Sequence, residues 1–217
     1  MKHAGDDRAV PKDSDEGRRR QHGRLPWPTP DELAPDARAL YENILSGPRM
    51  QSSFIQRTDP DGRLHGPFNA LLTSPAIGEA LQHVGSQLRF AGTLPDRTRE
   101  MAILLVAQAH GSLFERYAHE PVARAADCTD DELETIWAGE VPASCNEKER
   151  VALEAVRHLV STHDLDDERF DLAHGVLGDG GLTELVALIG YYELLATLLK
   201  VWRTPVPDAC TQNPHGE

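Results

Sequence analysis

RTREMAILLVAQAHGSLFERYAHEPVARAA, residues 97–126, is the stretch of this sequence that decides the fold. Its first half is apolar on nearly every side of a helix between residues 101 and 109, which indicates a central helix rather than a surface helix. The pair His110-Gly111 interrupts the pattern, and a second helix is expected to begin directly after it. The stretch therefore predicts two helices packed as a hairpin at the centre of an all-α protein.

The second helix of this pair carries the residues with catalytic potential. Glu115 and His119 are four residues apart on one helical face, where a carboxylate can orient an imidazole. Glu100 lies at the start of the first helix, where the helix dipole favours a carboxylate. Ser112 is the expected N-cap, and Glu115 three residues later completes a capping-box pattern. Pro121 predicts a kink or a restart of the helix just after His119.

Each of these residues also has a purely structural interpretation. Glu100 is explained by a salt bridge to Arg97 or Arg99 at the start of its helix, and Glu115 by the capping box alone. A single His119 is more commonly a buried, hydrogen-bonded histidine than a catalyst. Together, on two helices that pack against each other, Glu100, Glu115 and His119 form a candidate active site.

Start and stop signals in the sequence predict the remaining helices. They are expected at residues 29–45, 67–72, 75–90, 129–137, 146–159, 166–177 and 182–202. The Thr-Asp-Asp-Glu run that begins at Thr129, and Asn146 followed by Glu149, are N-terminal capping signatures. No strand-like alternation of useful length occurs, so the sequence predicts an all-α fold of about eight helices.

Composition and charge restrict the class of protein. A chain of 217 residues can form one domain with a sizeable core. The net charge of −13 argues against a nucleic-acid partner, because neutralising phosphates requires a basic surface. The charged N-terminus lacks the apolar run of a signal peptide. Three cysteines without Cys-x-x-Cys or metal-ligand spacing are typical of a reducing compartment, and we expect a cytoplasmic protein.

The ends of the chain differ from its middle. Residues 1–24 are polar and without helical periodicity, so we expect a disordered tail, followed by one helical domain at 25–208 and a short C-terminal tail at 209–217. Residues 46–66 are rich in Gly, Ser, Asp and Pro and form the longest expected loop, which is a candidate lid. His65, at the end of this loop, either points into a pocket or is a loop histidine without a ligand role.

The segment 182–202 is long and apolar on most faces. Glu184, Glu193 and Lys200 interrupt it, which favours a core or subunit-interface helix over a membrane-spanning one. One small domain cannot bury so much apolar helix surface, so we expect a homo-oligomer, with multiples of dimers or trimers, and no membrane partner.

The central motif also resembles the core of the carboxymuconolactone decarboxylase family, which shares its helical fold with the alkylhydroperoxidase D proteins. The peroxidase branch has a Glu, a Cys-x-x-Cys twelve residues later and a His four residues after the second Cys. Here Glu100 and His119 stand at matching positions, while Ser112 and Glu115 replace the two thiols. The Gly-Pro-Phe-Asn-Ala-Leu-Leu run at 66–72 and Thr-Pro-Val-Pro at 204–207 resemble the decarboxylase branch. The resemblance covers roughly residues 25–208, and it implies an alkylhydroperoxidase D-like helical bundle.

What the resemblance implies for function is a carbon–carbon lyase without cofactor or metal. Without thiols a disulfide relay cannot run, whereas an imidazole beside carboxylates can move protons. Loss of CO2 from a small carboxylated lactone or enol acid would leave a dienolate, which His119, oriented by Glu115 or Glu100, would protonate. Ser112, or its backbone N–H, is the expected donor to the enolate oxygen. The expected substrate-binding residues are Ser112, His65, Phe68 and Tyr192.

Three other functions remain open at this point. The same His and Glu residues suit an isomerase, a cyclase or a dehydratase. Two carboxylates and one imidazole can hold Fe(II) or Mn(II), although no second histidine stands at ligand spacing. A non-catalytic helical assembly protein could use the motif for packing alone.

Overall fold

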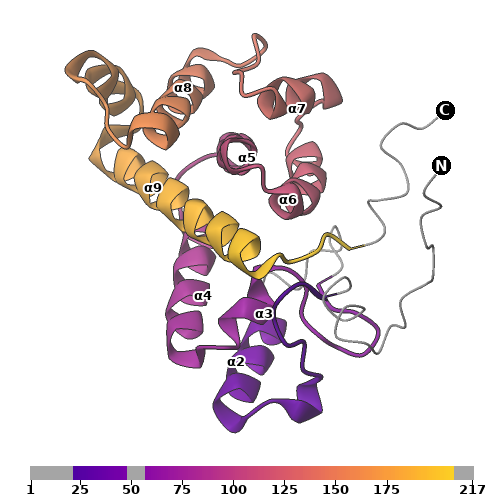
Figure 1. Ribbon diagram of the computed structural model, residues 1–217. Helices are drawn as coiled ribbons and strands as arrows, with labels where there is room; N and C mark the ends of the chain where they lie inside the picture. Colours follow the sequence, from indigo (N-terminus) through magenta and orange to yellow (C-terminus); the bar gives the residue numbers. More distant parts are fainter. Residues whose placement is uncertain (1–21, 48–56, 208–217) are drawn as a thin grey trace, which may run out of the picture.

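The structure is a computed structural model that describes residues 22–47 and 57–207. The predicted tails at 1–21 and 209–217, and residues 48–56 of the predicted loop, lie outside the described residues. In the described part the elements are a 3-10 turn and eight α-helices (Figure 1). They are η1 (Pro30–Glu32), α2 (Pro35–Ser46), α3 (Pro67–Leu71), α4 (Pro75–Phe90), α5 (Asp96–His110), α6 (Leu113–Ala125), α7 (Asp130–Trp137), α8 (Glu147–Thr162) and α9 (Asp167–Trp202).

The all-α prediction is confirmed. The described residues contain no β-strand, and the one β-bridge joins Thr58 to Leu64. Two helix starts with a predicted capping signature have the full capping box, at Thr129 with Glu132 and at Asn146 with Glu149. In each case a side-chain oxygen accepts the N3 amide and the glutamate accepts the N-cap amide, which satisfies two helix-end donors.

Helix α5 is the centre of the larger part of the molecule. Figure 1 shows α5 end-on, with α6, α7, α8 and α9 around it. Residues 101–107 are all buried, at most 3% exposed, as the continuous apolar pattern predicts. Gly111 ends the helix in the left-handed conformation at φ 61°, and α6 returns along α5 to form the expected hairpin.

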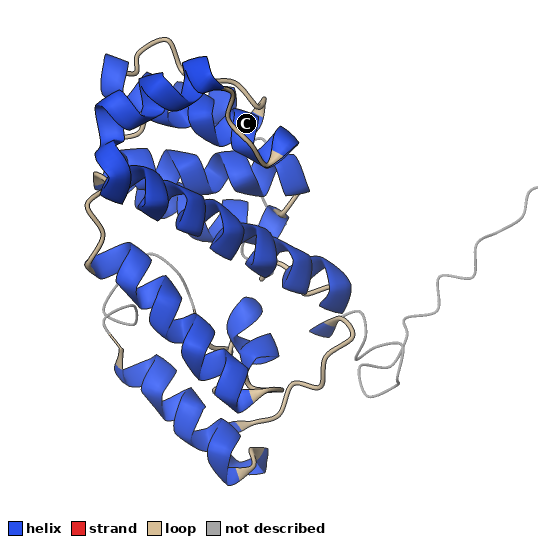
Figure 2. Ribbon diagram, turned by 90° about the vertical axis from the view of Figure 1, so that its left-hand side faces the viewer, coloured by secondary structure: helices blue, strands red, loops and turns tan. Residues whose placement is uncertain are grey.

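Helix α9 separates two layers of helices. Helices α5 to α8 lie on one side of it, and α2, α3 and α4 lie on the other (Figures 1 and 2). The larger core joins α5, α7, α8 and α9, and a smaller core around Leu40, Ile44 and Leu71 holds α2 and α3 together. The site described below lies where α5 and α6 approach α3, α4 and α9.

The structure modifies some of the predicted boundaries and confirms one. The helix expected at 29–45 is split, because Pro35 requires an extended residue before it and Ala34 has ψ 155°. Helix α6 continues through Pro121 without restarting. The expected break after 177 is present, since Gly178 has non-helical φ 66° and ψ 179° inside α9. Residues 22–24, placed by the sequence in the tail, lie against the end of α9, where the Arg24 amide donates to the Trp202 carbonyl at 2.7 Å.

By length and composition alone, α9 could cross a membrane. Its Gly178 break interrupts the helix, and α9 packs against α3, α4, α5 and α8. These contacts are those of a core helix of a globular bundle.

Candidate functional site

A buried hydrogen bond joins the two helices of the central hairpin. The Nδ1 atom of His119 on α6 lies 2.7 Å from Oε2 of Glu100 on α5, and the Glu100 side chain is fully buried. The apolar surroundings of α5 bury Glu100, so its charge must be balanced by neighbours rather than by water. The structure therefore selects Glu100, rather than Glu115, as the group that orients the imidazole.

Two arginines complete the balance of charge at Glu100. Arg89, at the end of α4, places Nη2 3.3 Å from the second carboxylate oxygen, and Arg99 places Nε 3.6 Å from the same atom. Burial alone would raise the pKa of Glu100, but the charge and hydrogen bond of His119 and the two guanidinium groups outweigh it. The pKa therefore lies below its ordinary value, Glu100 is ionised, and Nδ1 of His119 carries the proton that it donates.

A small cavity of about 60 Å³ lies in front of His119. Its walls come from five parts of the fold: the loop before α3, α3 itself, α4, α6 and α9. The lining residues are Arg57, Pro67, Phe68, Arg89, Phe114, Glu115, Ala118, His119, Tyr192 and Leu195.

Glu115 is the most unusual residue of this wall. Glu115 is only 3% exposed. Neither of its carboxyl oxygens makes a well-formed hydrogen bond within the described part of the chain. Burial raises the pKa of Glu115 to about 8, although the nearby Ser112 hydroxyl acts in the opposite direction. Glu115 is therefore a neutral carboxylic acid at pH 7, next to the ionised Glu100 and its hydrogen bond with His119.

Aromatic side chains hold the imidazole and shape the cavity. The Tyr192 ring on α9 meets the His119 ring edge-on, with centroids 5.1 Å apart. The Phe114 ring packs against the backbone of Gly66, where an added Cβ would come within 2.3 Å of it. Gly66 has φ 68° and begins α3, which carries Phe68 into the wall. Four of the predicted site residues thus meet here: Glu115, His119, Phe68 and Tyr192.

The structure places two predicted binding residues elsewhere. Ser112 is buried outside the cavity wall, and its backbone N–H donates to the Ala107 carbonyl at 2.8 Å, so that amide is not available to an enolate oxygen. The expected Ser112–Glu115 capping box is absent, because the Ser112 side chain makes no cap hydrogen bond. The ring of His65 packs edge-on against Trp27, with centroids 5.7 Å apart, and does not line the cavity.

Sequence reasoning missed the two cationic wall residues, Arg57 and Arg89. Arg57 belongs to the loop that the sequence marks as a candidate lid. The length of that loop was the available signal that one of its residues could reach the site. Arg89 follows Leu88 at the end of an amphipathic helix, and nothing local distinguishes it from a surface arginine. Only the approach of α4 to α5 brings it to Glu100.

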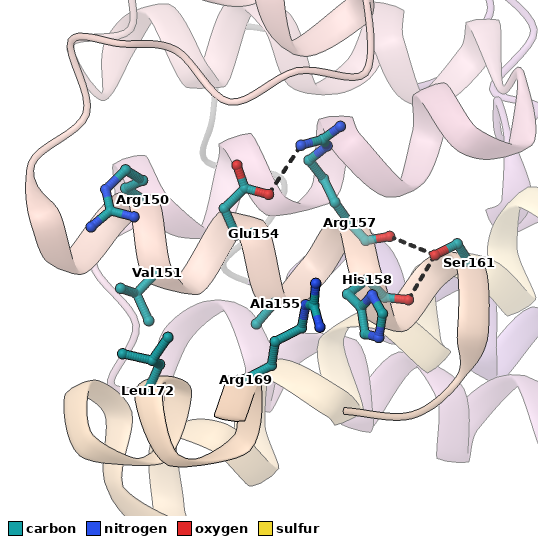
Figure 3. Close-up of a pocket in the computed structure, with 9 residues that line it drawn as sticks. All are labelled: Arg150, Val151, Glu154, Ala155, Arg157, His158, Ser161, Arg169 and Leu172. Atoms are coloured by element: carbon teal, nitrogen blue, oxygen red, sulfur yellow. Dashed lines mark hydrogen bonds and ion pairs between the residues drawn. The ribbon is translucent and has the colours of Figure 1, made fainter. Parts of the chain in front are cut away.

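Two larger hollows lie away from this site. One, of about 490 Å³, is lined by the ends of α5 and α8, and the other, of about 290 Å³, lies between α8 and the start of α9. Figure 3 shows that the three arginines of the second hollow point in different directions, with Arg157 paired to Glu154. Its polar residues are mostly exposed and satisfied by such local pairs. The small cavity is the better candidate because it combines buried ionisable groups with apolar walls.

The cysteines of the described chain do not contribute to this site. Cys128 is 5% exposed, and burial raises the pKa of its thiol to about 11, which disfavours the thiolate. Cys145 also has a pKa raised by burial. Within residues 22–47 and 57–207, no three His, Cys, Asp or Glu side chains are grouped so that they could hold a metal ion.

Comparisons with known proteins identify a matching family model. Residues 75–158, which contain Glu100, Ser112, Glu115 and His119, match the sequence profile of the Carboxymuconolactone decarboxylase family. No curated protein matches the chain.

Solved structures are similar in fold. An uncharacterised peroxidase-related protein from Ralstonia eutropha, described as an alkylhydroperoxidase AhpD core, has a TM-score of 0.68 at 16% identity and covers 86% of this chain and 93% of its own. A peroxidase-related protein from Silicibacter has a TM-score of 0.66 at 11% identity and covers 86% and 92%. The debrominase Bmp8 in complex with 2,3,4-tribromopyrrole has a TM-score of 0.62 at 15% identity and covers 81% and 88%. At these identities the likeness shows a shared fold.

Proposed function

We propose that this chain, whose residues 75–158 match the model of the Carboxymuconolactone decarboxylase family, is a carbon–carbon lyase that works by proton transfer through His119. The observation that carries the proposal is the buried Glu100–His119 pair, 2.7 Å apart, at the wall of a cavity. An ionised carboxylate behind an imidazole fixes its tautomer and stabilises its protonated form.

The cavity wall supports a small anionic substrate. Arg57 and Arg89 bring two positive charges to a space otherwise bounded by Phe68, Phe114 and Leu195. A planar carboxylated lactone or enol acid has the matching combination of apolar faces and negative charge.

The proposed reaction has two steps. The bond between the ring carbon and the carboxylate breaks, CO2 leaves, and the electron pair stays on the substrate as a dienolate. His119 then transfers a proton from Nε2 to the dienolate carbon, while Nδ1–H remains bonded to Glu100. Water returns the proton to His119, so no oxidant or reductant is consumed.

The test is turnover of a panel of carboxylated lactones and enol acids, followed by CO2 release and by deuterium incorporation in D2O. We expect His119→Ala to lower kcat by roughly 10²- to 10⁴-fold. His83→Ala, an exposed histidine on α4, is the matched control and should retain full activity. Full turnover by folded His119→Ala would disprove the assignment, and isomerisation without CO2 release would replace the lyase by another proton-transfer enzyme.

A further inference from the structure

An enolate formed in this cavity needs a hydrogen-bond donor, and the donor expected from the sequence is occupied. The Ser112 amide is bonded to Ala107 inside the hairpin, and the Ser112 side chain lies outside the cavity wall. In the described chain the remaining polar groups of the wall are Arg57, Arg89, Glu115, His119 and Tyr192.

Among these, Glu115 has the geometry of an unused ligand-binding group. It is 3% exposed, it lines the cavity, and its two carboxyl oxygens make no well-formed hydrogen bond within residues 22–47 and 57–207. The nearby Ser112 hydroxyl interacts with this carboxyl group but does not offset its burial, so hydrogen bonds from a ligand would stabilise it further. Glu115 also precedes His119 by one helical turn, so both side chains reach the same space.

We propose that the Glu115 carboxyl group is the oxyanion donor of this site: it donates a hydrogen bond to the substrate oxygen on which negative charge develops. This inference rests on the proposed function and adds a second role to it. His119 transfers a proton to carbon, whereas Glu115 keeps its proton and shares it with the oxygen.

The electrostatic surroundings agree with this division of roles. Burial holds the Glu115 carboxyl in its neutral form at pH 7, and a neutral acid can donate where a carboxylate can only accept. The charged groups around it are Arg57 from the loop, Arg89 from α4, His119 from its own helix and Glu100 behind the imidazole on α5. Tyr192 lines the same cavity from α9.

Two substitutions separate donation from other roles. Glu115→Gln keeps a donor in its amide group but cannot ionise, and Glu115→Leu keeps the size without any donor. On a substrate that the wild type turns over, we expect kcat for Glu115→Gln within about 10-fold of wild type at pH 7. For Glu115→Leu we expect a loss of about 10²- to 10³-fold, the usual effect of removing one oxyanion donor.

The pH profile supplies a sharper criterion. Wild-type activity should fall above pH 8 as Glu115 ionises. Glu115→Gln should lack this contribution and keep only the fall that deprotonation of His119 causes. A Glu115→Gln variant as impaired as Glu115→Leu would show that Glu115 transfers its proton and would overturn the proposal. Wild-type activity that rises through pH 8 would overturn it as well, by making Glu115 a base.

A binding experiment with acetate tests the donor role of Glu115 without knowledge of the substrate. Acetate is a small oxyanion, and its binding can be followed by NMR titration. We expect wild-type affinity to fall at least 10-fold between pH 6.5 and 9.5, Glu115→Gln to lack this fall, and Glu115→Leu to bind more weakly at pH 6.5. Equal affinity in all three proteins would overturn the donor role. If the wild type turns over nothing in the panel yet acetate follows this pattern, the proposed function fails while the donor role stands.

Discussion

The protonated state of Glu115 predicts a measurable change in stability that needs no substrate. Its pKa is about 8 in the folded protein, against an ordinary value of 4.5, because burial disfavours the charged form. The unfolded chain therefore releases the proton near pH 4.5, whereas the folded chain keeps it until about pH 8. The contribution of Glu115 to the free energy of unfolding therefore decreases as pH rises between these two values.

The magnitude follows from the two pKa values. Each pH unit between them lowers the free energy of unfolding by about 1.4 kcal/mol. At pH 7 this free energy is therefore roughly 3 kcal/mol lower than at pH 4 through Glu115 alone. Glu115→Gln cannot ionise in either state and removes this loss. We expect the variant to be more stable than wild type by up to about 3 kcal/mol at pH 7, and equal to it at pH 4. For a chain of this size that gain corresponds to a rise in Tm of roughly 6–12 °C at pH 7.

The assay is urea unfolding followed by circular dichroism, on wild type and variant, at several pH values from 4 to 8.5. Glu134→Gln, an exposed carboxylate on α7, is the control, and its difference from wild type should not change with pH. The other titrating groups are common to both proteins and cancel in the difference. A Glu115→Gln difference that is constant with pH, or a variant less stable than wild type at pH 7, would refute the reasoning.

Three further predictions follow from other parts of the structure. Thiol-dependent peroxidase activity should be absent, because the Cys128 thiol is buried with a pKa of about 11, and peroxide turnover abolished by Cys128→Ser would contradict this. Gly66→Ala should lower the free energy of unfolding by about 1–3 kcal/mol, since φ is 68° and the new Cβ would clash with Phe114; unchanged urea unfolding would disprove the clash. The protein should be an oligomer in solution, because Val186 and Val201 of α9 are 50% and 52% exposed, and a monomeric mass by light scattering at micromolar concentration would remove that argument.

The sequence by itself determined the helices and the central pair. Local signals suffice for these features, because capping residues, prolines and apolar periodicity act over one or two helical turns. Thr129, Asn146 and Gly111 each end or begin a helix where their side chains or backbone freedom predict it. The spacing of Glu100 and His119 was also readable, since the hairpin turn at Gly111 folds the second helix back onto the first.

Only the tertiary structure decided the partners and the charge states. Glu115 and Glu100 are both carboxylates near one histidine in the sequence. The packing of α4 brings Arg89 to Glu100, whereas burial dominates at Glu115, which lines the cavity beside Phe114. One is therefore ionised and the other neutral at pH 7. Ionisation depends on burial and on charges from distant helices, and no pattern of neighbouring residues encodes either.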